Sequence, residues 1–199
     1  MSELFVAGLV QAADGARTVG RPKPLLPYAG TTLLDHTLGI AHACEFDQLL
    51  VELDRPGKVR ERVDLSGAQI VPTLCAAIDA LDPGVTVLVV LRGDHPGVTP
   101  ATVRLLLAAR GDAPVAACRY DDGRGYPYAF SSDVFDELRA GARPDDYDAA
   151  EVPVAGPVPL DVDTWADYEA VVAAAGQPLN TGVMVAPVSA GARRKGLRD

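Results

Sequence analysis

The apolar run at residues 4–10, LFVAGLV, constrains the fold of this chain more than any other feature. It places seven consecutive residues without a charged or polar side chain in one segment. A short continuous run of this kind is typical of a strand that is buried on both faces, as in the centre of a parallel sheet. Such a strand needs other elements packed against both faces, so the run predicts a layered domain.

The rest of the chain supplies those elements, because strand patterns alternate with helical ones. Residues 85–91, VTVLVVL, form the clearest central strand. The alternation predicts a three-layer α/β domain with a Rossmann-like, mostly parallel sheet, whose ligands bind beyond the C-terminal strand ends. We expect further strands at 48–53, 68–71, 114–119, 128–130 and 151–154, helices at 31–43, 58–65, 73–81, 100–109, 133–139 and 165–175, and a turn at 123–127.

Length and charge limit the classes of function. The 199 residues fit one domain, which we expect at 1–175, followed by a mobile basic tail at 176–199. A net charge of −9 argues against nonspecific binding to nucleic acid or to anionic membranes, and no apolar run is long enough to span a bilayer. Cys44, Cys75 and Cys118 are widely spaced in apolar surroundings, which predicts buried thiols in the cytoplasm.

The loop after the first strand is rich in glycines and cations. Gly15 and Gly20 allow backbone N–H groups to approach a ligand closely, and Arg17, Arg21 and Lys23 supply positive charge. A strand followed by such a loop favours phosphate binding. The loop lacks both the Gly-Lys-Ser/Thr of a P-loop and the G-x-G-x-x-G of a dinucleotide site. The strand–glycine opening alone leaves a nicotinamide-dependent reductase as a weak alternative.

Asp94 is the strongest single candidate for a functional residue. It follows the central strand in the sequence Arg-Gly-Asp-His-Pro. A carboxylate at the end of a buried strand is costly unless it is solvated, caps a turn or binds a cation. Mg²⁺ needs only one or two protein carboxylates, with phosphates and water completing its octahedron. The neighbouring His95 is interpreted as a bystander, and capping of the next turn is the alternative role of Asp94.

Several ordered motifs resemble the MobA/MocA-like NTP transferases, the family of the molybdenum-cofactor nucleotidyltransferases. Its signature loop, L-A-A-G-x-G-x-R-x-G-x-x-K followed by leucine and proline, departs here at two positions: Gln11 replaces an apolar residue and Asp14 replaces a glycine. The family's G-D-x-P appears at Asp94 and its D-x-D-T at 161–164. Alternation along a strand end is expected to place Asp161 and Asp163 on the same side. The positions that match the loop are Ala12, Ala13, Gly15, Arg17, Gly20, Lys23, Leu25, Leu26 and Pro27.

The resemblance implies a role for each matched residue and a fold of the nucleotide-diphospho-sugar transferase type. Arg17, Lys23 and Asp94 are then the catalytic residues, and Asp94 and Asp163 the ligands of Mg²⁺. For Asp163, or for Thr164, a helix N-cap is an alternative or additional role. The segment 123–130 resembles G-x-x-G-H-P-x-x-F, with Tyr126 at the histidine. The implied nucleotide-binding set is Ala12, Ala13, Asp14, Gly15, Arg17, Lys23 and Asp94, and the acceptor-binding set is Gly125, Tyr126 and Pro127.

The implied activity is transfer of a nucleoside monophosphate from CTP or GTP to a phosphorylated acceptor such as a molybdopterin-type cofactor, with release of pyrophosphate. A molybdoenzyme-related partner protein is a further implication. Three departures weaken the nucleotide site: Asp14 adds a carboxylate near the triphosphate, while Pro72 and Ala76 replace a glycine and a serine at the third helix. The alternative is therefore a degenerate family member that binds a ligand or a protein without catalysis.

Overall fold

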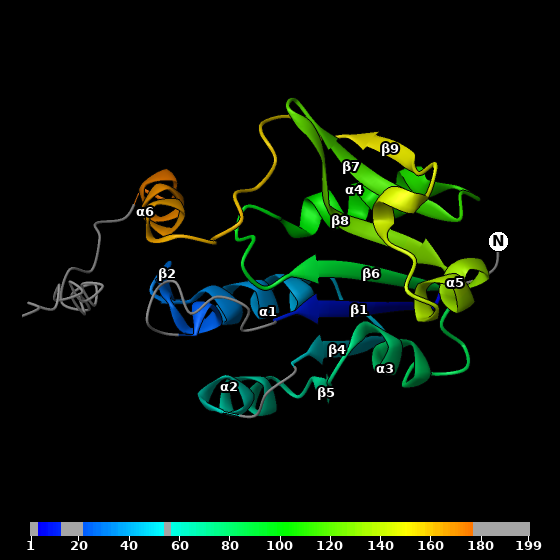
Figure 1. The fold of residues 1–199 in the computed structure, drawn as a ribbon, viewed down its shortest axis with the longest axis horizontal. Coiled ribbons are helices and arrows are strands. Elements are labelled where there is room, and N and C mark those ends of the chain that lie inside the picture. Colours follow the sequence, from blue (N-terminus) through cyan, green and yellow to red (C-terminus); the bar gives the residue numbers. More distant parts are fainter. Residues whose placement is uncertain (1–3, 13–21, 54–56, 177–199) are drawn as a thin grey trace, which may run out of the picture.

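The computed structural model describes residues 4–12, 22–53 and 57–176. Its elements follow the expected alternation of strands and helices (Figure 1). In chain order they are β1 (Val6–Gln11), η2 (Lys23–Leu25), β2 (Pro27–Tyr28), β3 (Thr31–Thr32), α1 (Leu33–Ala43), β4 (Gln48–Glu52), α2 (Lys58–Ser66), β5 (Gln69–Val71), α3 (Leu74–Asp79), β6 (Val87–Arg92), α4 (Pro100–Arg110), β7 (Val115–Tyr120), β8 (Gly123–Ser131), η3 (Ser132–Val134), α5 (Phe135–Arg139), η4 (Pro144–Asp146), β9 (Ala150–Pro153) and α6 (Trp165–Ala174).

Within the described residues, seven strands form one sheet in the order β5-β4-β1-β6-β8-β7-β9. The pairs β5–β4, β4–β1, β1–β6 and β7–β9 are parallel, whereas β8 runs antiparallel to both β6 and β7. The prediction of a mostly parallel α/β sheet is therefore confirmed. The first apolar run becomes β1, which lies at the centre of the parallel part, as its burial on both faces requires.

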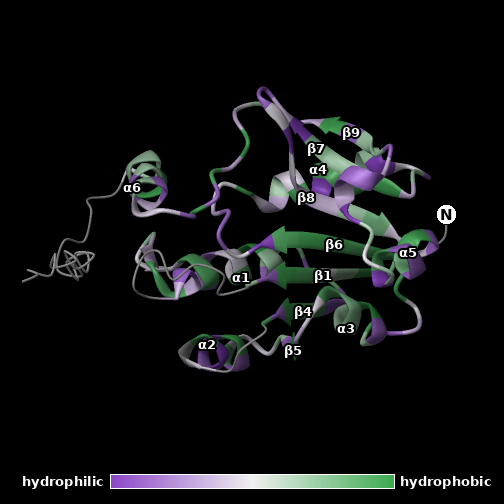
Figure 2. Ribbon diagram, in the orientation of Figure 1, coloured by the Kyte–Doolittle hydropathy of each residue, from purple (hydrophilic) through white to green (hydrophobic). Residues whose placement is uncertain are grey.

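Helices cover both faces of the sheet, which gives the expected three layers. Along β1, Val6 and Val10 pack with α1, α2 and α4 on one face, while Ala7 and Leu9 pack with α3 and α5 on the other. This alternation follows from the period of two in a strand. Figure 2 shows the result: β1 and β6 are hydrophobic along their length and hydrophilic at their C-terminal tips. The core thus ends where the candidate site begins.

The expected turn at residues 123–127 is wrong. These residues form the first half of β8, and the turn lies at 121–122, between Tyr120 and Gly123, which pair directly. The glycines suggested a turn, but cross-strand packing prevails over local turn propensity here. Gly125 is needed for another reason, since a Cβ at this position would lie 2.9 Å from a methyl group of Val158. Gly125 therefore faces the segment that follows β9, to which Val158 belongs.

The remaining expectations concern the cysteines, membrane-spanning segments and the C-terminal tail. Cys118 is buried, as predicted for all three cysteines, whereas Cys44 and Cys75 are half-buried. In the described part of the chain, no helix combines the length and the hydrophobicity needed to cross a membrane. The predicted basic tail lies outside the described residues except for Gly176.

Candidate active site

The C-terminal ends of β1 and β6 lie side by side and form the base of the site. Gln11 pairs with Arg92 in the parallel register, and the Gly93 N–H donates to the Gln11 carbonyl at 2.9 Å. A Cβ at residue 93 would lie 3.1 Å from that carbonyl oxygen, so glycine allows the two chains to approach this closely. Thr37 of α1 donates to the Gly93 carbonyl at 3.5 Å. The turn that carries Asp94 is thus fixed by β1 and α1.

Asp94 is held by the guanidinium of Arg92. The Arg92 Nε and Nη2 atoms donate to Oδ1 and Oδ2 of Asp94, each at 3.1 Å, while the Asp94 residue is only 8% exposed. A bidentate arginine–carboxylate pair is strong and directional. Arg92 was given no role from the sequence, although a cation two residues before Asp94 at a strand end was a usable signal, because opposite charges so close in the chain can pair.

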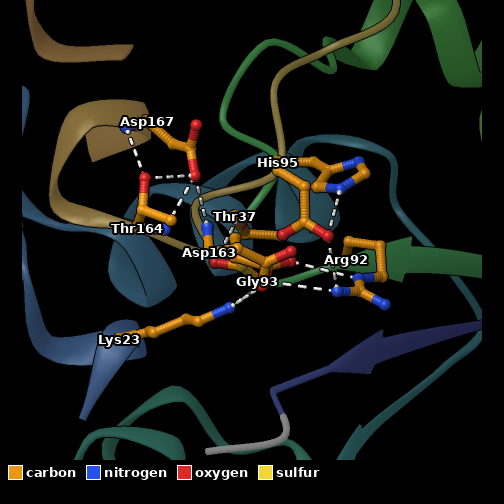
Figure 3. Close-up of polar contacts among 10 residues, drawn as sticks. Lys23, Thr37, Arg92, Gly93, His95, Asp163, Thr164 and Asp167 are labelled. Atoms are coloured by element: carbon orange, nitrogen blue, oxygen red, sulfur yellow. Dashed lines mark hydrogen bonds and ion pairs between the residues drawn. The ribbon is translucent and has the colours of Figure 1, made fainter. Parts of the chain in front are cut away.

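Lys23 also lies near the Asp94 carboxylate, and Figure 3 shows Lys23 and Arg92 reaching into the cluster from different sides. Lys23 belongs to η2, is buried, and places its Nζ atom 2.5 Å from Asp163 Oδ1 and 3.8 Å from Asp94 Oδ2. The structure thus brings together three of the predicted residues, Lys23, Asp94 and Asp163. Lys23 bridges the two carboxylates that the family resemblance assigns to the metal.

A crossing segment, residues 154–163, returns from β9 over the strand ends and delivers the last carboxylates (Figure 1). It is tied to the β7–β8 turn, where Asp121 accepts from the Gly156 N–H at 3.1 Å and Asp122 accepts from the Val158 N–H at 2.7 Å. Farther along, Pro159 contacts Gly97 in the loop after Asp94. The segment therefore closes one side of the site.

Asp161 and Asp163 have different partners, and the expectation that strand alternation places both on one side is wrong. The Asp161 carboxylate accepts from Arg92 Nη2 at 3.3 Å and lies 3.9 Å from His95 Nε2, whereas Asp163 binds Lys23. The reason is that these residues do not form a strand, so a period of two does not apply. Thr164, one of the two predicted caps, is the N-cap of α6, where its hydroxyl accepts from the Asp167 N–H at 3.2 Å.

The charges of the site stabilise one another. Burial disfavours the charge of Arg92, but hydrogen bonding to Asp94 and attraction to both carboxylates raise its pKa above the ordinary value. The nearby His95 ring, followed by Asp94 and Arg92, holds the pKa of Asp161 well below its usual range. Three carboxylates, of Asp94, Asp161 and Asp163, face two cations, Arg92 and Lys23. The cluster therefore keeps one net negative charge.

Tyr126, predicted on the acceptor side, borders this cluster from β8. Its ring centroid lies 5.7 Å from that of His95 and 5.8 Å from Arg92 Cζ. Its hydroxyl donates to Gln11 Oε1 at 3.4 Å, and Gln11 Nε2 donates to Glu52 at 2.8 Å. Gln11 and Tyr126 are two departures from the family motifs, and they contact each other. Gly125 and Pro127 are buried in β8 beside Tyr126.

Part of the predicted nucleotide site lies outside the described residues, namely Ala13, Asp14, Gly15 and Arg17. Ala12, the last described residue before them, is buried and donates its N–H to the Glu52 carbonyl at 3.0 Å. At the start of α3, the Ala76 N–H donates to the hydroxyl of Thr73, which is the N-cap, at 3.1 Å. Pro72 is exposed just before this cap.

The site contains groups that suit a divalent ion. Potential ligand atoms of Asp94, His95 and Asp161 all lie within 4.8 Å of one another. Among the described residues, both ring nitrogens of His95 and the Asp161 Oδ1 atom are buried without a hydrogen-bond partner. Buried polar atoms are rarely left unpaired, and such exceptions call for an explanation. Carboxylate oxygens and an imidazole nitrogen are chemically able to hold a divalent metal.

Comparison with known proteins assigns the family. The model of the MobA-like NTP transferase domain matches residues 8–152. The chain therefore belongs to the MobA-like NTP transferase family. A comparison with curated proteins returned no match.

Solved structures agree with this assignment. Rv0371c from Mycobacterium tuberculosis H37Rv is 34% identical, with a TM-score of 0.76, over 87% of this chain and 100% of that one. Its structure in complex with manganese is 35% identical, with a TM-score of 0.72, over 84% of this chain and 98% of the other. The 4-diphosphocytidyl-2C-methyl-D-erythritol synthase from Anaerococcus prevotii DSM 20548, at 12% identity, shares the fold, with a TM-score of 0.68 over 87% of this chain and 99% of that one. These likenesses support a nucleotidyltransferase fold.

Proposed function

We propose that this protein transfers a nucleoside monophosphate from CTP or GTP to a phosphorylated small-molecule acceptor such as a molybdopterin-type cofactor. The acceptor phosphate oxygen attacks the α-phosphorus, and the bond from that phosphorus to the pyrophosphate oxygen breaks. Pyrophosphate leaves with the electron pair of that bond. The observation that carries the proposal is the buried Lys23–Asp94 pair at the C-terminal edge of the parallel strands.

The residues of the chain have separate tasks in this proposal. Lys23, together with Arg17 from the signature loop, offsets the charge that builds up on the leaving pyrophosphate. Asp94, with Asp163 or Asp161, would hold a divalent ion, which when bound neutralises phosphate charge. A structure of the related Rv0371c contains manganese, which supports a divalent ion here, with Mg²⁺ as the ion expected from the family.

The acceptor is assigned to the side of Tyr126. The aromatic ring beside Arg92 offers a flat surface with a cation next to it, which suits a ring system that carries a phosphate. A molybdoenzyme-related protein is the proposed recipient of the product, by likeness to the family. The free thiols of Cys44, Cys75 and Cys118 support a reducing, cytoplasmic site of action.

Binding without catalysis is the second candidate function. Arg92 occupies both oxygens of Asp94, and Lys23 lies between Asp94 and Asp163, so the carboxylates already have cationic partners. Pro72 and Ala76 also lack the close backbone approach and the hydroxyl that the family has at the third helix. These features favour a protein that retains a ligand without turning it over.

Pyrophosphate release separates the two candidates. The protein is incubated with each NTP, with Mg²⁺ or Mn²⁺, and with a pterin or sugar phosphate as acceptor. We expect release with one pyrimidine or guanine nucleotide and dependence on both the acceptor and the ion, with Asp94→Asn as the inactive control. NTP binding by calorimetry without pyrophosphate release under any combination supports the binding module instead.

A further inference from the structure

His95 is a buried imidazole without a hydrogen-bond partner in the described residues. Its side chain is 8% exposed, and neither Nδ1 nor Nε2 has a hydrogen-bond partner in the part of the chain that the structure describes. Leaving a buried polar group unpaired is costly. Figure 3 shows the ring turned toward the acidic cluster, and Nε2 lies 3.9 Å from Asp161 Oδ2. The Asp161 Oδ1 atom is also buried and has no hydrogen-bond partner within residues 4–12, 22–53 and 57–176.

The distances around His95 suit one bound ion. The ligand atoms of Asp94, His95 and Asp161 lie within 4.8 Å of one another. Two ligands of one small divalent ion, each at ~2.1 Å, are at most about 4.2 Å apart. Closing the remaining gap takes side-chain shifts of less than an ångström. The expected ligand Asp163 is instead bound to Lys23 and is not part of this group.

We propose that Asp94, His95 and Asp161 form a site for a first-row divalent transition ion, with Mn²⁺ bound in preference to Mg²⁺. Mg²⁺ selects oxygen ligands, whereas an imidazole nitrogen favours transition ions, and Mn²⁺ accepts both. His95 is therefore the residue that sets the choice of metal. This site would supply the divalent ion of the proposed function, and the inference rests on that function for the role of the metal but not for its binding.

The positive charges of Arg92 and Lys23 limit the affinity of this site for a metal ion. Arg92 donates to both Asp94 and Asp161, so the ion must displace at least part of this contact. The net charge of the five groups, three carboxylates against Arg92 and Lys23, still favours a cation. We therefore expect a site of moderate affinity in the free protein, and tighter binding when the arginine charge is removed.

The test uses Mn²⁺ alone, with no nucleotide. Electron paramagnetic resonance measures free Mn²⁺ during a titration of the intact protein, and spin-echo modulation reports a directly bonded imidazole nitrogen. We expect one ion per chain, a nitrogen signal, and displacement by Mg²⁺ only at roughly tenfold or greater excess. His95→Gln should abolish the nitrogen signal and weaken Mn²⁺ binding by about tenfold or more, while Arg92→Gln should strengthen it several-fold.

Controls separate the site from a general effect on the fold. His42 is exposed on α1, so His42→Gln should leave both the affinity and the nitrogen signal unchanged. Circular dichroism checks that each variant is folded. If His95→Gln does not fold, the nitrogen signal of the natural protein and its loss of Mn²⁺ affinity on Asp161→Asn test the proposal.

Three results would overturn the inference: no Mn²⁺ binding by the free protein, binding without nitrogen modulation, or no selectivity over Mg²⁺. The outcome is independent of turnover. Nitrogen-coupled Mn²⁺ binding in a protein that never releases pyrophosphate supports the site and counts against the proposed function. Normal turnover with Mg²⁺ in His95→Gln, together with absent nitrogen modulation in the natural protein, supports the proposed function and counts against the His95 site.

Discussion

Individual side chains at this site act through their neighbours, and the clearest cases are the departures from the family motifs. Gln11 and Tyr126 are hydrogen-bonded to each other, and Glu52 holds the other end of the Gln11 amide. Burial raises the pKa of Tyr126 above its ordinary value, so the phenol keeps its proton and remains a donor. The two departures therefore form one polar arrangement between β1 and β8, and replacing either residue alone would remove the hydrogen bond that joins the two strands' side chains.

Lys23 is expected to affect nucleotide and metal in opposite directions. Removing its charge in Lys23→Gln takes away a phosphate contact but also a cation that competes for Asp94. We expect NTP binding to weaken and binding of free Mn²⁺ to tighten by roughly fivefold, which corresponds to ~1 kcal/mol at water-like screening. Calorimetry with each ligand measures both. As a control, Arg60→Gln on α2 removes an equal charge elsewhere and should change neither the NTP affinity nor the Mn²⁺ affinity. Weaker binding of both NTP and Mn²⁺ by Lys23→Gln would contradict the proposed competition between Lys23 and the metal.

At the scale of elements, local patterns predicted most of the architecture. The run at 4–10 and the strand at 85–91 became the central pair, because burial on both faces leaves few alternatives for such runs. The predicted turn at 123–127 was wrong because Gly123, Arg124 and Gly125 pair with β7 across the real turn at 121–122, and sequence spacing does not reveal this pairing.

The candidate site, too, could be predicted from the sequence only in part. Lys23 and Asp94 were found from motifs, but the contacts of Arg92 and His95 with Asp161 were not, since they depend on a segment that arrives about 65 residues later in the chain. The choice of Asp163 as a metal ligand followed the family motif, whereas the expected alternation of Asp161 and Asp163 assumed a strand in a stretch that is not one. Contacts of this kind require the tertiary structure.

The N-terminus of α6 carries a pH-dependent cap. Hydrogen bonds from the Thr164 hydroxyl and backbone to Asp167 lower the pKa of this carboxyl below its ordinary value of 3.8. A lowered folded pKa means stabilisation that is present above 3.8 and is lost as the pH falls through the folded value. We expect Asp167→Asn to lower the melting temperature at neutral pH, with the difference from the natural protein shrinking toward zero in acid. A difference that is constant with pH would mean that ionised Asp167 contributes nothing to the cap.

At the scale of the whole molecule, α6 belongs to an apolar cluster of its own. Tyr168, Val171 and Val172 pack on Leu26 and Leu33, apart from the two clusters that line the sheet. The Tyr168 hydroxyl donates to the Pro27 carbonyl at 2.6 Å. This cluster is small, yet it anchors the end of the crossing segment. The positions of Asp161 and Asp163 therefore depend on a part of the molecule that is separate from the main core.

We therefore expect α6 to open without unfolding of the sheet, because stability varies between cooperative units within a structure. Val172→Ala removes buried methyl groups from the α6 cluster at a cost of about 2 kcal/mol. Hydrogen exchange measured by mass spectrometry should then speed up in α6 and the crossing segment, while β1 and β6 keep their protection. Binding of metal and nucleotide should weaken, since the open form loses Asp161 and Asp163. Val63→Ala, on the buried face of α2, is the matched control and should lower the melting temperature without selectively exposing α6. Equal acceleration of α6 and β6 in Val172→Ala would show that the helix and the sheet form one cooperative unit.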